Sequence, residues 1–290
     1  MSHAVVARNV NKRHPGFALS DFSLQVDSGC ITGIFGPTGA GKTTLLKIFA
    51  GITRPDSGEL TVLGMSYSDR EREIKDRIGF VSEEPHLYPD KSLEWIGSFL
   101  RSVYSSWDPT RFSDLMRRFR IDSRKKIREL SRGQRALALL AAALSHDPDV
   151  IVLDQPLSGL DLLVRRGVLA LFRELVTDEE KTIVLASHIT DGLVGLVDHV
   201  AFMSAGRLIL YEEKDVLMSK WKWLRFREDG LPAEVLETLS LVEDTGFGMS
   251  GLTNQFDDIS EQLARPIASG DLSVDGATLD DVLVALLKGG

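Results

Sequence analysis

A glycine-rich stretch near the N-terminus has the residue types and spacing of a loop that binds phosphate groups. Gly36 is followed, after four residues, by Gly41, Lys42 and Thr43. Glycines allow backbone N–H groups to turn inward around a phosphate chain, Lys42 would reach its terminal phosphates, and the Thr43 hydroxyl would ligate Mg²⁺. The predicted phosphate-binding residues are Gly36, Pro37, Thr38, Gly39, Ala40, Gly41, Lys42, Thr43 and Thr44.

The segments on either side of this loop predict a strand and a helix. CITGIF (30–35) has the length and apolar character of a short buried strand, and TTLLKIFA (43–50) has the pattern of a helix that stops at Gly51. A helix N-terminus carries a partial positive charge that favours bound anions. The loop is therefore predicted to lie where a strand ends and a helix begins.

A second part of the site is predicted at the end of another strand. DVIVLD (149–154) places four apolar residues directly before Asp154, which indicates a central parallel strand covered on both faces. Burying an aspartate without a cation is costly, so Asp154 is predicted to share Mg²⁺ with Thr43. The next residue, Gln155, is an amide at the place where such a site needs a carboxylate to activate water.

The composition excludes several classes of protein. The chain has 290 residues and a net charge of −8, whereas a protein that coats nucleic acid normally shows a basic surface, so no nucleic-acid partner is expected. The single Cys30 excludes an internal disulfide and fits a reducing compartment. The longest apolar run, 136–144, is about half as long as a membrane span. We therefore expect a cytoplasmic chain that depends on another chain for any membrane crossing.

The stretch that precedes Asp154 resembles the signature motif of ABC-type ATPases. Residues 130–134 read Leu-Ser-Arg-Gly-Gln, where the family has Leu-Ser-Gly-Gly-Gln with a tolerant middle position. The family places this motif at a helix N-terminus that contacts a γ-phosphate. The resemblance therefore implies that Ser131, Gly133 and Gln134 also contact ATP.

Two further motifs agree with this resemblance. SGLD (158–161) resembles the family's D-loop, and TIVLASH (182–188) resembles a buried strand that ends in the family's switch histidine, here His188. Five motifs in the expected order cover approximately residues 3–215.

The resemblance implies an α/β fold, a P-loop NTPase of ABC type with a mixed sheet core, an antiparallel β subdomain and a helical subdomain at about 84–145. We expect the ATP-binding domain to span 1–217 and a small α+β C-terminal domain to span 218–290. Within the latter, 220–228 alternate like a strand, 231–241 suggest a helix, and a last helix follows Thr278 as its N-cap.

The resemblance also implies cofactors and partners. In the family, two such domains enclose two ATP molecules with Mg²⁺, and each nucleotide contacts the P-loop of one subunit and the signature of the other. One set of motifs is present here, so the simplest expectation is a homodimer. The EEPHLYP stretch (83–89) resembles exporter-type bacterial transporters, which implies a separate polytopic transmembrane permease that holds this chain at the inner face of the cell membrane.

Three positions depart from the family pattern. The aromatic residue that stacks on adenine falls by register on His14, with Phe17 as the neighbouring candidate. Glu83 replaces the usual glutamine that contacts Mg²⁺ and the attacking water, although a carboxylate can also ligate Mg²⁺. Gln155 stands at the position of the general base, with His188 and Glu83 as the other catalytic candidates. It is either an introduced substitution that traps the ATP-bound state, which we favour, or a naturally slow site.

Two other functions stay open at this stage. The chain could be a naturally slow ABC subunit that acts as an ATP-dependent regulatory binding module, or an ABC ATPase that works outside transport. The second class normally shows two nucleotide domains in one chain, a long coiled coil or a basic face, and we find none of these in the sequence. The transported molecule cannot be read from this chain, because its contacts would lie in the permease.

Overall fold

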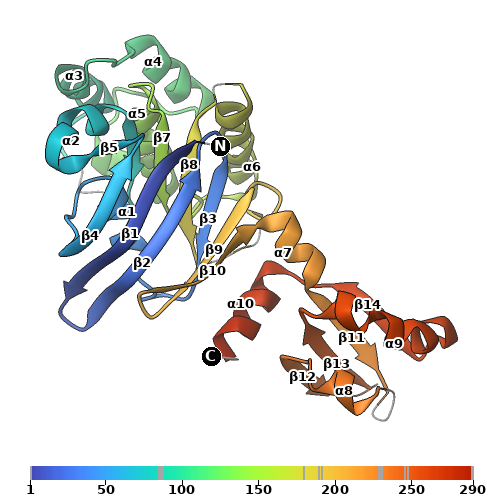
Figure 1. Cartoon of the computed structure of the whole chain (residues 1–290). Coiled ribbons are helices and arrows are strands. Elements are labelled where there is room, and N and C mark those ends of the chain that lie inside the picture. The colour runs from blue at the N-terminus through green and yellow to red at the C-terminus, as the bar shows by residue number, and fades with distance from the viewer. Residues whose placement is uncertain are drawn as a thin grey trace. The chain divides into compact units, whose positions relative to one another are not determined.

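The computed structural model describes residues 2–83, 88–178, 180–188, 190, 192–227, 231–244, 246 and 248–288. The chain forms two compact units, which we describe separately (Figure 1). Unit 1 comprises Met1–His188 and Gly195–Tyr211, and unit 2 comprises Ile189–Val194 and Glu212–Gly290. The domain boundary between 217 and 218 stays a prediction.

A six-stranded sheet forms the centre of unit 1, with the strand order β10-β9-β3-β8-β7-β6. The strands from β9 to β6 run parallel to their neighbours. All residues of β3, β7 and β8 are buried, as expected for strands covered on both faces. The strands are β3 (Ile31–Phe35), β6 (Ile78–Val81), β7 (Val150–Asp154), β8 (Thr182–Ser187), β9 (His199–Ser204) and β10 (Arg207–Glu213).

This topology brings the two predicted halves of the site to one edge of the sheet. Parallel strands present their carboxyl ends at the same edge, and β8 pairs with both β3 and β7. The glycine-rich loop after β3 and Asp154 at the end of β7 therefore lie near each other. The strands predicted before the loop and before Asp154 are confirmed.

A separate antiparallel sheet, in the order β2-β1-β4-β5, completes the β part of unit 1. Its inward side chains share one hydrophobic core with helix α1 (Lys42–Phe49), so burial of Phe22, Leu45 and Phe49 joins this sheet to the helix that follows the loop. Its strands are β1 (His3–His14), β2 (Phe17–Asp27), β4 (Ser57–Val62) and β5 (Met65–Ser66).

Several helices start at polar side chains that cap them. Ser92 caps α3, Asp108 caps α4, Ser131 caps α5 and Asp161 caps α6, each by accepting hydrogen bonds from N–H groups of the first turn. The other helices of unit 1 and its 3₁₀ turn η1, within the described ranges, are α2 (Tyr67–Asp76), α3 (Leu93–Val103), α4 (Pro109–Arg118), η1 (Ile127–Glu129), α5 (Arg132–Leu144) and α6 (Leu162–Thr177).

A tight turn between β9 and β10 supports the glycine-rich loop from the side. Ala205 and Gly206 both have positive φ, 46° and 75°, as a two-residue hairpin turn requires. The N–H of Gly206 donates to Ala40 O at 3.0 Å, and its carbonyl accepts from Ser20 N at 3.0 Å. A Cβ at Gly206 would lie 1.9 Å from the backbone of Ala18, so only glycine fits this contact.

Unit 2 is built around a four-stranded antiparallel sheet in the order β12-β13-β11-β14. The element order β-α-β-β-α-β with this strand order is the split β-α-β arrangement. The predicted strand and last helix are confirmed, and Thr278 caps that helix through Asp281 N. The elements are α7 (Lys214–Lys220), β11 (Lys222–Phe226), α8 (Ala233–Leu236), β12 (Leu241–Asp244), β13 (Met249–Thr253), α9 (Phe256–Ser269), β14 (Leu272–Gly276) and α10 (Leu279–Lys288).

The helix predicted at 231–241 is shorter in the structure, where α8 covers four residues. Val235 of α8 packs into the core of unit 2, whereas Leu241 already belongs to β12. Tertiary pairing with β13 therefore overrides the helical pattern at the end of this segment. None of the helices in the described ranges combines the length and apolar character needed to span a membrane.

His146 is a buried titratable group in the core between α5 and the sheet. It is 1% exposed, its ring stacks on Tyr104 with a centroid separation of 4.0 Å, and its Nε2 bonds to Ile78 O at 3.1 Å. Burial disfavours the imidazolium and lowers the pKa of His146 below its ordinary value.

His146 should make the stability of unit 1 depend on pH. In the unfolded chain the imidazole gains a proton as the pH falls below about 6.5, whereas the buried imidazole of the folded chain resists protonation. The free energy of unfolding is therefore fully retained above that pH and decreases as the pH falls below it. The unfolding midpoint measured between pH 7.5 and 5.5 should fall less steeply in His146→Gln than in the unchanged chain. An equal slope in both proteins would contradict this assignment.

Candidate nucleotide site

Lys42 holds a positive charge inside the glycine-rich loop. Its Nζ donates to Gly36 O at 2.7 Å and to Pro37 O at 2.8 Å, and the residue is 6% exposed. Burial lowers the pKa of Lys42, and the neighbouring carboxylates of Asp154 and Glu83 oppose that shift. With the N–H groups at the start of α1, this ammonium group makes the loop a site for anions.

Two glycines of the loop are required by its geometry. Gly36 has φ 156°, and a Cβ there would lie 2.1 Å from Met203 O. Gly41 has φ 101° at the N-cap of α1, and a Cβ there would lie 2.4 Å from the ring of Phe17. The loop backbone can therefore close around a ligand only because these side chains are absent.

Asp154 and Thr43 form the centre of the site. The Thr43 hydroxyl donates to Asp154 Oδ2 at 2.7 Å, although 111 residues separate them in sequence. Asp154 is 2% exposed, and its Oδ1 is buried without a hydrogen-bond partner. Burial raises the pKa of Asp154, and the bond from Thr43 opposes this.

This donor set fits a magnesium ion. The unpartnered Oδ1 and the Thr43 hydroxyl are oxygen ligands, which Mg²⁺ prefers, and the ion takes its other ligands from phosphate and water. Within the described ranges no cluster of three or more His, Cys, Asp and Glu could hold a metal by itself. The site therefore suits an ion that arrives with a nucleotide.

Gln155 is held in an uncommon conformation beside His188. Its φ is 52°, in the left-handed region that residues other than glycine rarely adopt. Its N–H donates to Ala186 O at 3.0 Å, and His188 Nδ1 lies 3.0 Å from its side-chain Oε1. The structure thus brings together the predicted base position and the predicted switch histidine, and the amide oxygen accepts from the imidazole.

Glu83 faces the same region from the end of β6. Together with Asp154, Gln155, Arg132 and Ser158 it lines a pocket of about 490 Å³. Arg132 contacts Glu83 Oε1 at 3.7 Å and donates to Ser158 Oγ at 3.2 Å. Arg132 therefore links the start of α5 to the end of β6 and to the D-loop. The sequence motifs did not predict these contacts. The only indication in the sequence is that Arg132 stands where the family signature has a glycine.

The signature residues form the capped start of α5. Ser131 Oγ accepts from Gln134 N at 3.1 Å, and Gln134 Oε1 accepts from Ser131 N at 3.1 Å, which is a capping box. Gly133 lies against the D-loop, where a Cβ would be 3.1 Å from Gly159 O. Within the described part of the chain, no hydrogen bond joins these residues to the glycine-rich loop of the same chain.

The two candidates for adenine stacking lie at one hairpin. His14 ends β1, is exposed, and pairs across the turn with Phe17. Phe17 is half-buried, and its ring lies against Gly41 of the loop. The contact of Phe17 with the loop makes it the better placed of the two, while the assignment of His14 stays a prediction.

Comparison with known proteins shows the family to which this chain belongs. Residues 19–158 match the family model described as ABC transporter. The chain is 34% identical over 202 residues to the ABC transporter ATP-binding protein NatA of Bacillus subtilis (strain 168), which covers 66% of this chain and 80% of that protein. This chain belongs to the ATP-binding subunits of ABC transporters.

A second relative agrees with this family, and a solved structure shows the same fold. It is 32% identical over 216 residues to the Nod factor export ATP-binding protein I of Cupriavidus metallidurans, over 72% of this chain and 71% of that protein. A dimeric structure of MJ0796, a bacterial ABC transporter cassette, superposes with a TM-score of 0.66 at 24% identity, over 72% of this chain and 98% of that one. The predicted fold class is confirmed, and membership of this family implies binding of ATP, typically with Mg²⁺.

Replacement of Lys42 by alanine should weaken ATP binding by about tenfold or more, because the terminal phosphates lose a charged partner. Lys75→Ala is the matched control, since Lys75 is an exposed lysine that pairs with Glu71 on α2. Calorimetric titration with ATP measures both. Equal affinity of the two variants would overturn the assignment of the loop.

Proposed function

We propose that this chain is the ATP-binding and ATP-hydrolysing motor subunit of an ABC transporter. Two copies close head to tail around two ATP molecules and drive a separate transmembrane permease. The observation that carries the proposal is the hydrogen bond from Thr43 to the buried carboxylate of Asp154, beside the ammonium group of Lys42. This arrangement can bind a triphosphate together with its cation. Without the cation, the buried carboxylate of Asp154 is energetically costly.

The side chains of this site have different roles. Lys42 and the loop N–H groups would hold the phosphate chain, and Thr43 and Asp154 would hold Mg²⁺, which would neutralise charge on the phosphates. The capped start of α5 presents Ser131, an exposed side chain, to the nucleotide of the partner copy. Binding of ATP thereby closes the dimer, and hydrolysis reopens it.

Gln155 makes this cycle slow. An amide can hydrogen-bond the attacking water but cannot accept its proton. General-base assistance is typically worth about 10²- to 10⁴-fold in rate. The bond from His188 holds the amide oxygen in the place of a carboxylate oxygen. We infer that this protein binds Mg-ATP and stays closed for long periods.

The permease is proposed to bind at the aromatic stripe of the helical part. Tyr88, Trp95, Phe99 and Val103 are exposed large apolar side chains, and the Trp95 ring stacks on Phe99 at 5.5 Å and meets Tyr88 edge-on at 5.8 Å. Such a patch marks an interaction surface. The preceding Glu84 lies outside the described residues.

Transport direction and location follow from the same proposal. The similarity of residues 83–89 to exporter-type sequences supports export. The permease would hold the subunit at the inner face of the cell membrane. The alternative is a regulatory subunit that works through ATP-dependent dimerisation, and the observation that favours it is the amide of Gln155 at the position of the general base.

Substitution of Gln155 by glutamate should raise the steady-state ATPase rate by about 10²-fold or more, because it restores a proton acceptor beside the water. The unchanged chain should accumulate a long-lived dimer with Mg-ATP in light scattering, whereas the glutamate variant should form it only transiently. Gln25→Glu, an exposed amide-to-acid change on β2, is the control. Unchanged turnover in Gln155→Glu would favour the regulatory alternative.

A further inference from the structure

The four-stranded sheet of unit 2 has one face that packs on α8 and α9 and a second face that is only partly covered. Side chains alternate along β11, so Leu224 and Phe226 join the core with residues of α8 and α9, whereas Trp223 and Arg225 point to the second face. Strand pairing gives the second face two neighbouring rows of side chains. One row is Trp223, Leu252 and Leu241, and the next row is Arg225, Ser250 and Glu243.

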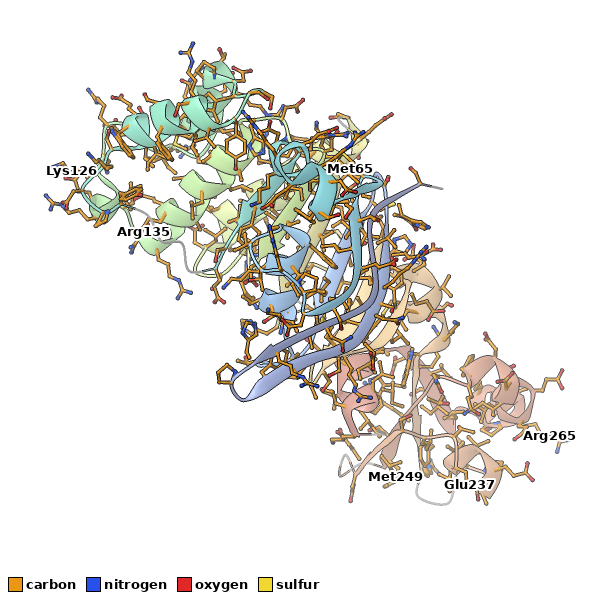
Figure 2. All side chains as sticks on the ribbon, turned by 60° about the vertical axis from the view of Figure 1, so that its left-hand side comes forward. Met65, Lys126, Arg135, Glu237, Met249 and Arg265 are labelled. Atoms are coloured by element: carbon orange, nitrogen blue, oxygen red, sulfur yellow. The ribbon has the colours of Figure 1, made fainter. Side chains whose placement is uncertain are left out.

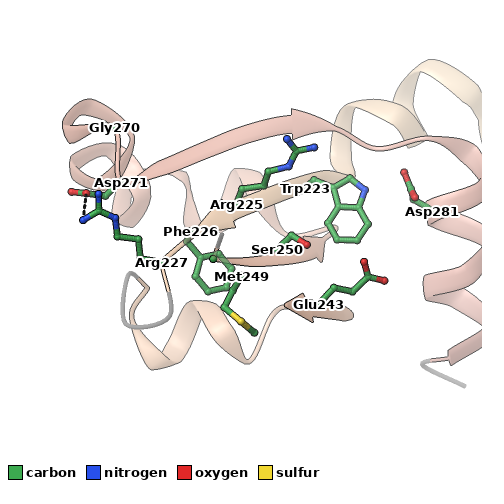
Figure 3. A pocket seen from close by; sticks show the side chains of 11 residues that line it. Trp223, Arg225, Phe226, Arg227, Glu243, Met249, Ser250, Gly270, Asp271 and Asp281 are labelled. Carbon is green, nitrogen blue, oxygen red and sulfur yellow. Dashed lines mark ion pairs between the residues drawn. The ribbon is translucent and has the colours of Figure 1, made fainter. Parts of the chain in front are cut away.

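Helix α10 covers the first row and leaves the second row open. Leu252 and Leu241 are buried beneath the helix, and the carboxyl of Asp281 on α10 accepts a hydrogen bond from the Trp223 side chain. The helix therefore forms a wall along the border of the second row. A pocket of about 660 Å³ lies at this step, and Figure 3 shows side chains that line it, among them Trp223, Arg225, Glu243, Ser250 and Asp281.

The charged side chains that line this pocket do not balance one another. Arg225 contacts Asp275 at 3.4 Å, and Arg227 contacts Asp271 at 3.9 Å, so each arginine already has an acidic partner. Glu243 is exposed and forms no ion pair with any residue in the described ranges. The carboxylate of Glu243 is therefore available to a cation in the pocket.

Asp281 adds a second carboxylate, and its hydrogen-bond partners are neutral. Burial raises the pKa of the Asp281 carboxyl, but bonds from Thr278 and from the Trp223 side chain outweigh this and lower it overall. Its Oδ2 accepts from Thr278 N at 2.8 Å and from Thr278 Oγ1 at 2.7 Å. Neutral donors favour the ionised carboxylate but do not cancel its charge. Asp281 and Glu243 thus bring two negative charges to the pocket that no described cation neutralises.

Ser250 supplies a buried polar group at the floor of the pocket. The residue is 6% exposed, lies between Arg225 and Glu243 in its row, and lines the pocket. Its hydroxyl makes no hydrogen bond to any of the residues that the structure describes. A buried hydroxyl without a partner is unfavourable, and a ligand that donates to its oxygen removes this penalty. This hydroxyl distinguishes the pocket from an acidic patch of the surface.

We propose that this pocket binds a primary ammonium group, either of a small amine or of a lysine side chain. The ammonium N–H groups donate to the Ser250 oxygen and to the Glu243 carboxylate, while Asp281 attracts the cation from the wall. The Trp223 ring, which Figure 3 shows beside these side chains, adds an aromatic surface that favours a cation.

The same groups select the kind of cation. Oxygen acceptors on Ser250 and Glu243 suit a cation that carries N–H donors, which a quaternary ammonium ion lacks. Within the described ranges no group of three or more His, Cys, Asp and Glu could hold a metal ion. The site lies within unit 2 and needs no nucleotide, so it goes beyond the motor function proposed above.

Ligand-observed NMR titration of the full chain with n-butylammonium, in EDTA and without nucleotide, tests this proposal. The unchanged chain should bind n-butylammonium about fivefold or more tightly than tetramethylammonium, and more tightly than butyrate, the anion of similar size. Glu243→Gln should weaken the binding of n-butylammonium by about fivefold or more, since the unpaired charge is lost. Ser250→Ala should weaken it by about threefold, since one acceptor is lost.

Glu237→Gln is the matched control, because it removes the same charge from an exposed position at the end of α8, outside the pocket (Figure 2). It should leave the affinity unchanged, and thermal unfolding should show that all variants fold. Tetramethylammonium or butyrate bound as tightly as n-butylammonium would overturn the proposal, as would an unchanged affinity in Glu243→Gln.

A titration with Nα-acetyl-lysinamide distinguishes the two sources of the ammonium group. Binding tighter than that of n-butylammonium indicates a lysine side chain of a protein partner, and weaker binding indicates a small free amine. Failure of both compounds to bind would overturn the proposal. ATP binding and turnover can persist in that case, because the pocket is built from residues of unit 2 alone, so the proposed motor function is tested separately.

Discussion

The burial of one carboxylate governs the nucleotide unit. Asp154 is 2% exposed at the end of a strand in which every residue is buried, and one of its oxygens has no hydrogen-bond partner. A negative charge in such a place needs a cation. The topology of the sheet brings the glycine-rich loop close to this carboxylate. The parallel strands β3 and β7 end at the same edge of the sheet, so the loop after β3 lies near Asp154. Thr43 and Lys42 reach this edge only because Gly36 and Gly41 let the loop turn there.

In the motor that we propose, the amide beside this carboxylate shifts the balance between ATP binding and hydrolysis. Gln155 has a strained left-handed backbone and a contact to His188, and it lines the same pocket as Asp154. Removal of one negative charge beside a triphosphate favours the bound state, and loss of the proton acceptor slows the chemistry. The motor that we propose therefore spends most of its cycle closed.

Much of this site could be predicted from sequence because its parts depend on local chemistry. A few adjacent residues are enough to predict each of three features. These are the glycine-rich loop with Lys42, the acid Asp154 after an apolar strand, and the helix capped by Ser131. Contacts between segments that are distant in sequence could not be predicted in this way. The ring of Phe17 against Gly41 and the bonds of Arg132 to Glu83 and Ser158 emerge only when the sheet and helices are assembled. In unit 2, the short strands β12 to β14 carry too little periodicity to be recognised before their pairing is known.

The central claim, that Asp154 completes a magnesium site for ATP, can be tested by ligand-induced stabilisation. The unfolding midpoint is measured with ATP in the presence of Mg²⁺ and in the presence of EDTA, for the unchanged chain and for Asp154→Asn, which keeps the shape of the side chain and removes its charge. The account predicts a clear gain from Mg²⁺ in the unchanged chain and loss of most of that gain in the variant. An equal gain from Mg²⁺ in both proteins would show that the cation binds elsewhere and would contradict the account.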